Sequence, residues 1–417
     1  AARAGEFQTP VLTLPDPPRR CSALPLEQLH PYAPGRFPEM EAVLDKFAAG
    51  QLWEDDRIGN YGFNEYGSSP HFLVENVSRP GQEPFTREDR LQASMYRYAG
   101  HVYSLDTYLW WNYVRSGDRR YYELARRHVL HLLDRQIGHV NDAMGRYGKY
   151  CDYASPYFWA DGALGQWSFY TDCGMWLSAF GGLRWGEDAA EHVAAAYERR
   201  SRNRDWLDGV PLHQGSPLRP WYGMLHEACA SYSYFWNLDH LCMAAELAAR
   251  LINPESLSGV MPGAGESAGR PEHTNVMLRP MIRYWLATQK ESARAAVSKI
   301  CENYYQASFD MHGYTMNLAP YVWATDYFVN RRPEVLAIGL EDVKAPFGRA
   351  WLGIPGFVEM DYWRSMGPNW KGYTATLPFL MAALAREPHV GRYPRLQVEA
   401  AYDDCSVYFD DPDDEPF

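Results

Sequence analysis

The sequence predicts an all-α protein, an (α/α) toroid or barrel built from about five to six helical hairpins. Two observations predict this fold class. From residue 37 onward, apolar residues recur three or four positions apart in long segments that are separated by Gly-, Pro- and Asn-rich joints. The segments also come in pairs, and one pair follows another every ~40–55 residues, which is the size of a two-helix repeat.

The two helices of each pair differ in character. The first is rich in Trp, Tyr, Met and small residues, whereas the second is amphipathic and rich in Arg, Glu and Ala. A helix that is apolar all round is buried, and an amphipathic helix faces water. We therefore expect an inner ring of helices enclosed by an outer ring, and an open solenoid of the same hairpins is the alternative.

The clearest hairpin lies between Arg87 and Gln136. Ser116-Gly117-Asp118 interrupts its helical spacing, so Gly117 is expected to end one helix and Asp118 to cap the next. Further pairs are predicted at 168–183 with 187–202, joined at Gly186, at 222–236 with 238–252, at 274–287 with 291–306, and at 318–329 with 334–340. Single helices are predicted at 38–49 and 375–386.

The two ends of the chain differ from this helical part, which we expect to form one domain over 37–390. The first 35 residues contain seven prolines, which excludes a helix or a central strand and predicts an extended Pro-rich arm over 1–36. Residues 391–417 are predicted to be an acidic tail. Seven acidic residues and no basic residue fall within 402–417, so we expect a solvated extension there.

The composition excludes several classes of protein. The net charge is −12 and no basic stripe is present, which argues against a nucleic-acid partner. No window approaches the ~20 consecutive apolar residues of a membrane span. None of the seven cysteines forms a C-x-x-C pair, so zinc-ribbon and thioredoxin chemistry have no support, and we expect neither a metal nor a cofactor.

The aromatic residues suggest a sugar ligand. The chain has 15 Trp and 30 Tyr against 17 Phe, so most of its rings carry a polar atom that needs a partner when buried. Many of these rings lie beside carboxylates, amides and imidazoles in the segments that lead into the inner helices, a combination suited to stacking on a sugar and hydrogen bonding its hydroxyls. The alternative is that they fill a wide core. The candidate sugar-binding residues are Asn64, Tyr66, Tyr153, Tyr157, Trp159, Trp221, His273 and His312.

Three stretches resemble one known family. They are Tyr61-Gly-Phe-Asn-Glu-Tyr66 followed by Pro70-His71, then Val114-Arg-Ser-Gly-Asp-Arg-Arg-Tyr-Tyr122, and Trp159-Ala-Asp-Gly162. From about residue 37 to 204 the chain is similar to the C-terminal α/α toroid of the rhamnogalacturonan exo-lyase-like proteins, which are six-hairpin carbohydrate-active proteins. The resemblance implies a toroid that follows β-rich domains in a longer protein.

The function we expect is that of a polysaccharide lyase, which cleaves an acidic, uronic-acid-containing polysaccharide by β-elimination. This reaction needs a base, a group that neutralises the uronic carboxylate, and an acid for the leaving oxygen. Arg219, Tyr222 and His226 fall within one short stretch. His226 follows Tyr222 by one helical turn, so both are expected to face the cleft. His71 is a further candidate catalytic residue.

Two other functions remain open at this point. A glycoside hydrolase needs two carboxyl groups ~5–9.5 Å apart. The pool of candidate carboxyl groups is Glu65, Asp161, Asp152, Asp172 and Glu227. The other possibility is a non-catalytic carbohydrate-binding or structural toroid of a larger extracellular assembly. In each case we expect a polysaccharide or oligosaccharide partner, an extracellular or periplasmic location, and either preceding β-rich domains or self-association.

Overall fold

The computed structural model describes residues 29–58, 105–131, 133, 172–192, 195, 219–252, 271–310, 319–340 and 367–387. All regular secondary structure in these residues is helical and none is β-strand, which confirms the all-α prediction for this part of the chain. The labelled helices are α2 (Pro38–Ile58), α5 (Leu105–Ser116), α6 (Arg119–His131), α7 (Asp172–Gly181), α10 (Arg219–Phe235), α11 (Leu238–Ile252), α12 (Pro271–Thr288), α13 (Glu291–Asp310), α14 (Ala319–Asn330) and α17 (Gly367–Arg386). Shorter helices at 185–192 and 334–340 follow α7 and α14.

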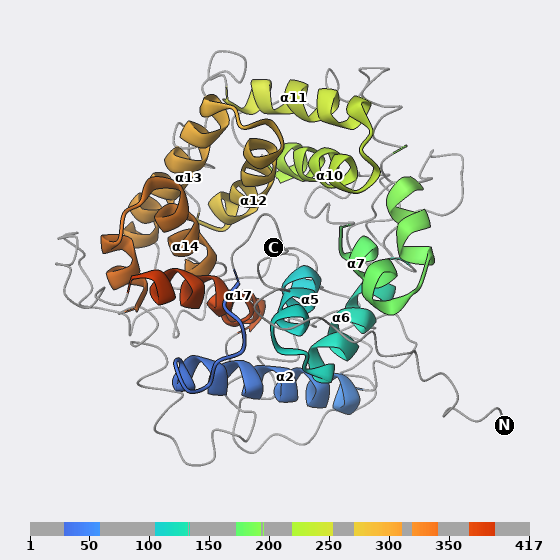
Figure 1. Cartoon of the computed structure of the whole chain (residues 1–417), viewed down its shortest axis with the longest axis vertical. Coiled ribbons are helices and arrows are strands. Elements are labelled where there is room, and N and C mark those ends of the chain that lie inside the picture. The colour runs from blue at the N-terminus through green and yellow to red at the C-terminus, as the bar shows by residue number, and fades with distance from the viewer. Residues whose placement is uncertain are drawn as a thin grey trace, which may run out of the picture.

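The helices pack as hairpins (Figure 1). Helix α5 packs on α6, α10 on α11, and α12 on α13. The first helices of the hairpins also contact one another in chain order: α5 contacts α7, α7 contacts α10, α10 contacts α12, and α12 contacts α14. Helix α17 packs against both α14 and α5, so the series of contacts returns to the helix where it began.

The two helices of a hairpin differ in how deeply they are buried. Residues 222–231 of α10 and 319–327 of α14 are buried without a break. In α6 and α11, by contrast, buried positions alternate with partly or fully exposed ones. This difference follows the composition, because the apolar helix of each pair is enclosed and its amphipathic partner keeps one face in water.

Each hairpin turns through one residue in the left-handed backbone conformation. Gly117, Gly182, Trp236, Gln289 and Arg331 have φ values between 53° and 72°. Each donates its backbone N–H to the carbonyl oxygen four residues earlier, at 2.6–3.0 Å. This bond satisfies one of the last carbonyls of the preceding helix. Only glycine adopts this conformation without a steric cost, so three of the five joints are strained.

The joint between α5 and α6 confirms the prediction made for it. Gly117 has a φ of 72° and follows the last residue of α5. Asp118 caps α6, since its Oδ1 accepts the backbone N–H of Arg120 at 2.9 Å.

The joint after α7 differs from the prediction. The chain turns at Gly182, whereas Gly186 lies inside the helix at 185–192. A Cβ on Gly186 would lie 2.1 Å from the carbonyl oxygen of Gly174 in α7. Gly186 is therefore required for the close approach of two helices and does not form the turn.

Helices α2 and α17 are longer than predicted. α2 continues to Ile58 and α17 begins at Gly367, so each gains about two turns. Gly50 is accommodated inside α2 although an interior glycine costs about 1 kcal/mol. Pro378 lies inside α17, where its carbonyl oxygen accepts the backbone N–H of His30 at 3.2 Å.

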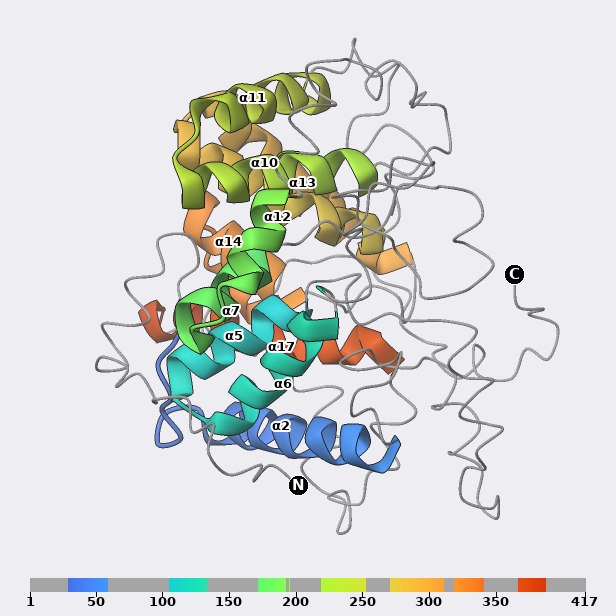
Figure 2. The ribbon, with the colours of Figure 1, turned by 90° about the vertical axis from the view of Figure 1, so that its right-hand side faces the viewer.

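Residues 29–37, before α2, have no regular secondary structure and include a turn at 34–36; residues 1–28 of the predicted arm and the predicted tail lie outside the described residues. Figure 2 shows α2 beside α6, and α2 contacts both α6 and α17. Among the described helices, none is long and apolar enough to cross a membrane.

Candidate functional site

The most highly charged part of the core surrounds Asp172, the first residue of α7. Arg279 and Arg283 of α12 each donate an Nη2 hydrogen to Asp172 Oδ2 at 2.7 Å. The Nε2 of His226 in α10 and the Oγ1 of Thr107 in α5 each lie 3.5 Å from the other carboxylate oxygen. All five side chains are buried. Together they form the Asp172 cluster.

Four helices place these groups. Asp172 begins α7, where the positive end of the helix dipole favours a carboxylate. Arg279 and Arg283 are four residues apart, so they share one face of α12. Because α5, α7, α10 and α12 contact one another in series, the cluster connects the first helices of successive hairpins.

The charges of the cluster set its protonation states. Burial by itself would raise the pKa of Asp172, but the guanidinium groups of Arg279 and Arg283 hold that pKa well below its usual range. Burial, assisted by Arg283, lowers the pKa of His226 to about 3 in spite of the nearby carboxylate. At neutral pH the carboxylate is therefore ionised and the imidazole is neutral.

A second buried carboxyl group belongs to the same region. Burial, and then the negative charge of Asp172, raises the pKa of Asp106 to about 7, against the opposing effect of a hydrogen bond with Cys173. Burial also raises the pKa of the Cys173 thiol, which stays protonated. Asp106 and Asp172 thus differ in protonation near neutral pH, which is the property of an acid–base pair of carboxyl groups.

Two side chains of the candidate site include a donor that has no hydrogen-bond partner among the described residues. These donors are the Nε–H of Arg283 and the hydroxyl of Tyr222, both buried. Tyr222 lies one helical turn before His226, and burial raises its pKa. A buried donor without a partner costs ~1–3 kcal/mol. In native proteins such donors are generally satisfied by ordered water or by a ligand.

The structure places the predicted site residues as follows. His226 and Tyr222 are buried in α10, and the candidate carboxyl groups of Asp172 and Glu227 are buried as well. Arg219 and Trp221 lie in the first turn of α10 and His273 in that of α12. The remaining candidates lie outside the described residues: His71, Glu65, Asp161, Asp152, Asn64, Tyr66, Tyr153, Tyr157, Trp159 and His312.

Sequence reasoning missed the two arginines, Asp106 and Thr107. A signal for the arginines was present, because Leu278-Arg-Pro-Met-Ile-Arg-Tyr284 places two bases one turn apart within an apolar helix. Charged residues at such positions are almost never fully buried unless paired. The partner, Asp172, is more than a hundred residues away in sequence, at 107 and 111 positions.

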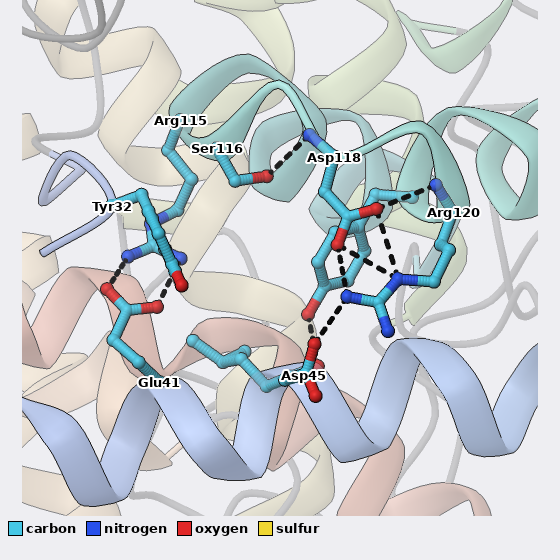
Figure 3. A pocket seen from close by; sticks show the side chains of 9 residues that line it. Tyr32, Glu41, Asp45, Arg115, Ser116, Asp118 and Arg120 are labelled. Carbon is cyan, nitrogen blue, oxygen red and sulfur yellow. Dashed lines mark hydrogen bonds and ion pairs between the residues drawn. The ribbon is translucent and has the colours of Figure 1, made fainter. Parts of the chain in front are cut away.

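A pocket of about 220 Å³ lies at the α5–α6 joint, against α2 (Figure 3). Arg115 pairs with Glu41, and both side chains are buried. Arg120 pairs with Asp45 and Asp118. The charged side chains of this pocket are therefore paired with one another, and they fasten α2 to the α5–α6 hairpin.

Within the described residues, no group of three or more His, Cys, Asp or Glu side chains is placed to hold a metal ion. No protein-family model, curated protein or solved structure matches this chain.

Proposed function

We propose that the helices form a closed (α/α) toroid of the carbohydrate-active type. Support comes from the contacts that run from α5 through α14 and return by way of α17. It comes also from the hairpin joints, which use the same left-handed residue and the same backbone hydrogen bond. An open solenoid would leave its two end helices without such a mutual contact.

We further propose that the chain is a polysaccharide lyase acting on an acidic polysaccharide, outside the cytoplasm. The observation that carries this proposal is that Arg279 and Arg283 both donate to one carboxylate oxygen. A pair of guanidinium groups aimed at one carboxylate is the arrangement that neutralises a uronic acid for removal of the adjacent proton. In this structure Asp172 itself occupies that position, so in this proposal a uronic carboxylate displaces Asp172 from the two arginines, and the Nε–H of Arg283 is a further donor.

The other groups required for β-elimination lie close by in sequence on α10. His226 is neutral above a pH of about 3, so its imidazole is in the proton-accepting form. The Tyr222 hydroxyl keeps its proton because burial raises its pKa, so it is present as a donor for the leaving oxygen. In this proposal the two arginines neutralise the uronic carboxylate. His226 accepts the proton adjacent to that carboxylate, and Tyr222 donates a proton to the leaving oxygen.

The test is a panel of uronic-acid polysaccharides, with product followed by the ultraviolet absorbance of an unsaturated uronide. His226→Ala should abolish the absorbance rise while circular dichroism shows an intact helical fold. His192→Ala is the matched control, because His192 is exposed on the helix at 185–192 and should leave turnover unchanged. Undiminished turnover by His226→Ala would reject the role of His226.

A glycoside hydrolase is the second candidate, and the contrast between Asp106 and Asp172 favours it. A carboxyl group with a pKa of about 7 can protonate a leaving oxygen, while its ionised neighbour acts as base or nucleophile. This function predicts new reducing ends without unsaturated product, and Asp106→Asn should abolish them. If the panel yields neither product, both enzymatic functions are rejected and the non-catalytic toroid, in which the Asp172 cluster only stabilises the core, is retained.

A further inference from the structure

The segment before α2 is bonded to two helices that lie far apart in sequence. The backbone N–H of His30 donates to the carbonyl oxygen of Pro378 in α17 at 3.2 Å, and the backbone N–H of Tyr32 donates to the carbonyl oxygen of Arg115 in α5 at 3.3 Å. Figure 1 shows this segment, in blue, running from α2 to the place where α17 and α5 meet. We refer to residues 29–33 as the strap.

The side chain of Arg115 holds the strap as well. Its Nε–H donates to the carbonyl oxygen of His30 at 2.7 Å, and its guanidinium pairs with Glu41 of α2 (Figure 3). Glu41 in turn accepts the backbone N–H of Ala33 at 3.0 Å. The side chains of Arg115 and Glu41 are 1% and 3% exposed. Hydrogen bonds to charged and buried groups are stronger than neutral ones, so the strap is firmly docked.

The contact between α5 and α17, which we refer to as the seam, is bridged by polar groups. The Nδ2–H of Asn112 in α5 donates across it to the carbonyl oxygen of Ala375 in α17 at 2.9 Å. Pro378 lies inside α17 and has no N–H to give to the carbonyl group four residues earlier. The carbonyl groups of Ala375 and Pro378 both accept from outside the helix, one from Asn112 and the other from the strap.

Aromatic rings connect the seam to the Asp172 cluster. The ring centroid of Phe379 in α17 lies 5.1 Å from that of Trp111 and 6.2 Å from that of Tyr108, both in α5. The guanidinium carbon of Arg279 lies 4.8 Å from the centroid of Trp111 and 5.6 Å from that of Tyr108. The same two rings of α5 therefore pack against α17 and against an arginine that binds Asp172.

We propose that the strap is a latch: it holds α17 against α5 while it is docked, and its release opens the seam and gives access to the Asp172 cluster. Access has to be provided, because all five side chains of the cluster are buried. The importance of this access for catalysis rests on the proposed function. The hold on the seam does not, since it follows from the bonds of the strap to both helices.

Tyr32→Pro tests the latch in the full chain, because proline lacks the N–H that Tyr32 donates to α5. Tyr32→Phe is the matched control, since it keeps both the N–H and the ring. The side chain of Tyr32 is 54% exposed, so circular dichroism should show the same helical content in both variants. Opening is measured by hydrogen exchange resolved to peptides. Access to Arg279 is measured by its rate of modification with phenylglyoxal, a reagent for guanidinium groups.

We expect Tyr32→Pro to exchange about fivefold or more faster at the seam, in both α5 and α17, which is the change expected from losing one hydrogen bond. Arg279 should be modified faster by a similar factor. Helix α13 and its exposed Arg294 should behave alike in all three proteins. Tyr32→Phe should match wild type throughout.

Three results would overturn the latch. They are faster exchange confined to residues 29–37, an equal increase in every helix including α13, and an open seam at which Arg279 reacts no faster than in wild type. Product release from uronic-acid polysaccharides is measured separately. An open seam in Tyr32→Pro with no product from any of the proteins rejects only the proposed function, whereas product with an unchanged seam rejects only the latch.

Discussion

Replacing Asp172 by Asn tests the central cluster most directly. The carboxylate accepts from Arg279 and Arg283 at 2.7 Å, and all three side chains are at most 5% exposed. Asparagine keeps the shape but removes the charge, so two buried guanidinium groups lose their counter-ion. Removing one partner of a buried ion pair costs ~3–5 kcal/mol. We expect a loss of this size or larger, against a total stability of ~5–15 kcal/mol for a typical domain.

The assay is urea unfolding followed by circular dichroism, with the free energy of unfolding obtained by linear extrapolation. Asp45→Asn is the control. Asp45 pairs with Arg120 on the surface, where the two side chains are 63% and 36% exposed. An exposed pair of this kind contributes ~0–1 kcal/mol.

A loss below about 1 kcal/mol for Asp172→Asn would refute the reasoning, because it would mean that the guanidinium groups reach solvent or another anion. A rescue variant checks the cause. Asp172→Leu combined with Arg279→Met and Arg283→Met removes the charges together, and it should recover most of the stability that Asp172→Asn loses. Failure to recover would show that packing, and not the unpaired charge, is responsible.

Three further predictions concern pH, a hairpin joint and the attachment of α2. The pKa of His226 is lowered from 6.5 to about 3, so between these values the unfolded chain binds a proton that the folded chain does not, and stability falls as the pH falls. The pKa of Asp106 is raised from 3.8 to about 7, so stability falls as the pH rises between those values. Each group changes the free energy of unfolding by ~1.4 kcal/mol per pH unit, and because the two changes have opposite signs they cancel between pH ~4 and ~6.5. Asp106→Asn should therefore be more sensitive to acid than wild type in urea unfolding at pH 4–6.5, and identical slopes would contradict this. Arg331→Gly should stabilise the protein by up to ~1 kcal/mol, since Arg331 has a φ of 57°; calorimetry would show an unchanged or higher melting temperature, and a clear decrease would count against strain at this joint. Arg115→Met should cost ~3–5 kcal/mol by leaving Glu41 buried and unpaired, and it should speed proteolysis before α2; cleavage at the wild-type rate would reject this role.

Local sequence patterns predicted the helices well, because helix periodicity and turn chemistry depend on residues that are close together in the sequence. Helix α11 begins at Leu238 and ends at Ile252 as the periodicity indicates. The Gly117-Asp118 turn was predicted from residue chemistry alone. Gly186 was misassigned because its role depends on contact with Gly174 in another helix, which no local pattern reveals.

The candidate site was harder to predict for the same reason. His226 and Tyr222 were found from their spacing on one helix, but the low pKa of His226 comes first from burial in the fold and then from Arg283 of α12. The left-handed joints at Trp236, Gln289 and Arg331 were also missed, since no glycine marks them. Tertiary packing determines both features, so they became visible only in the fold.

The two ends of the first helices carry different features: buried carboxyl groups at the beginning and left-handed joints after the end. Asp106 and Asp172 lie in the first turns of α5 and α7, where the helix dipole favours negative charge. The left-handed joints follow the opposite ends of α5 and α7, where a short turn returns the chain to the second helix of the pair. The chemistry at one end therefore does not depend on which residue occupies the turn at the other. A bulky, strained residue such as Trp236 can be retained at a joint because its cost is confined to that turn.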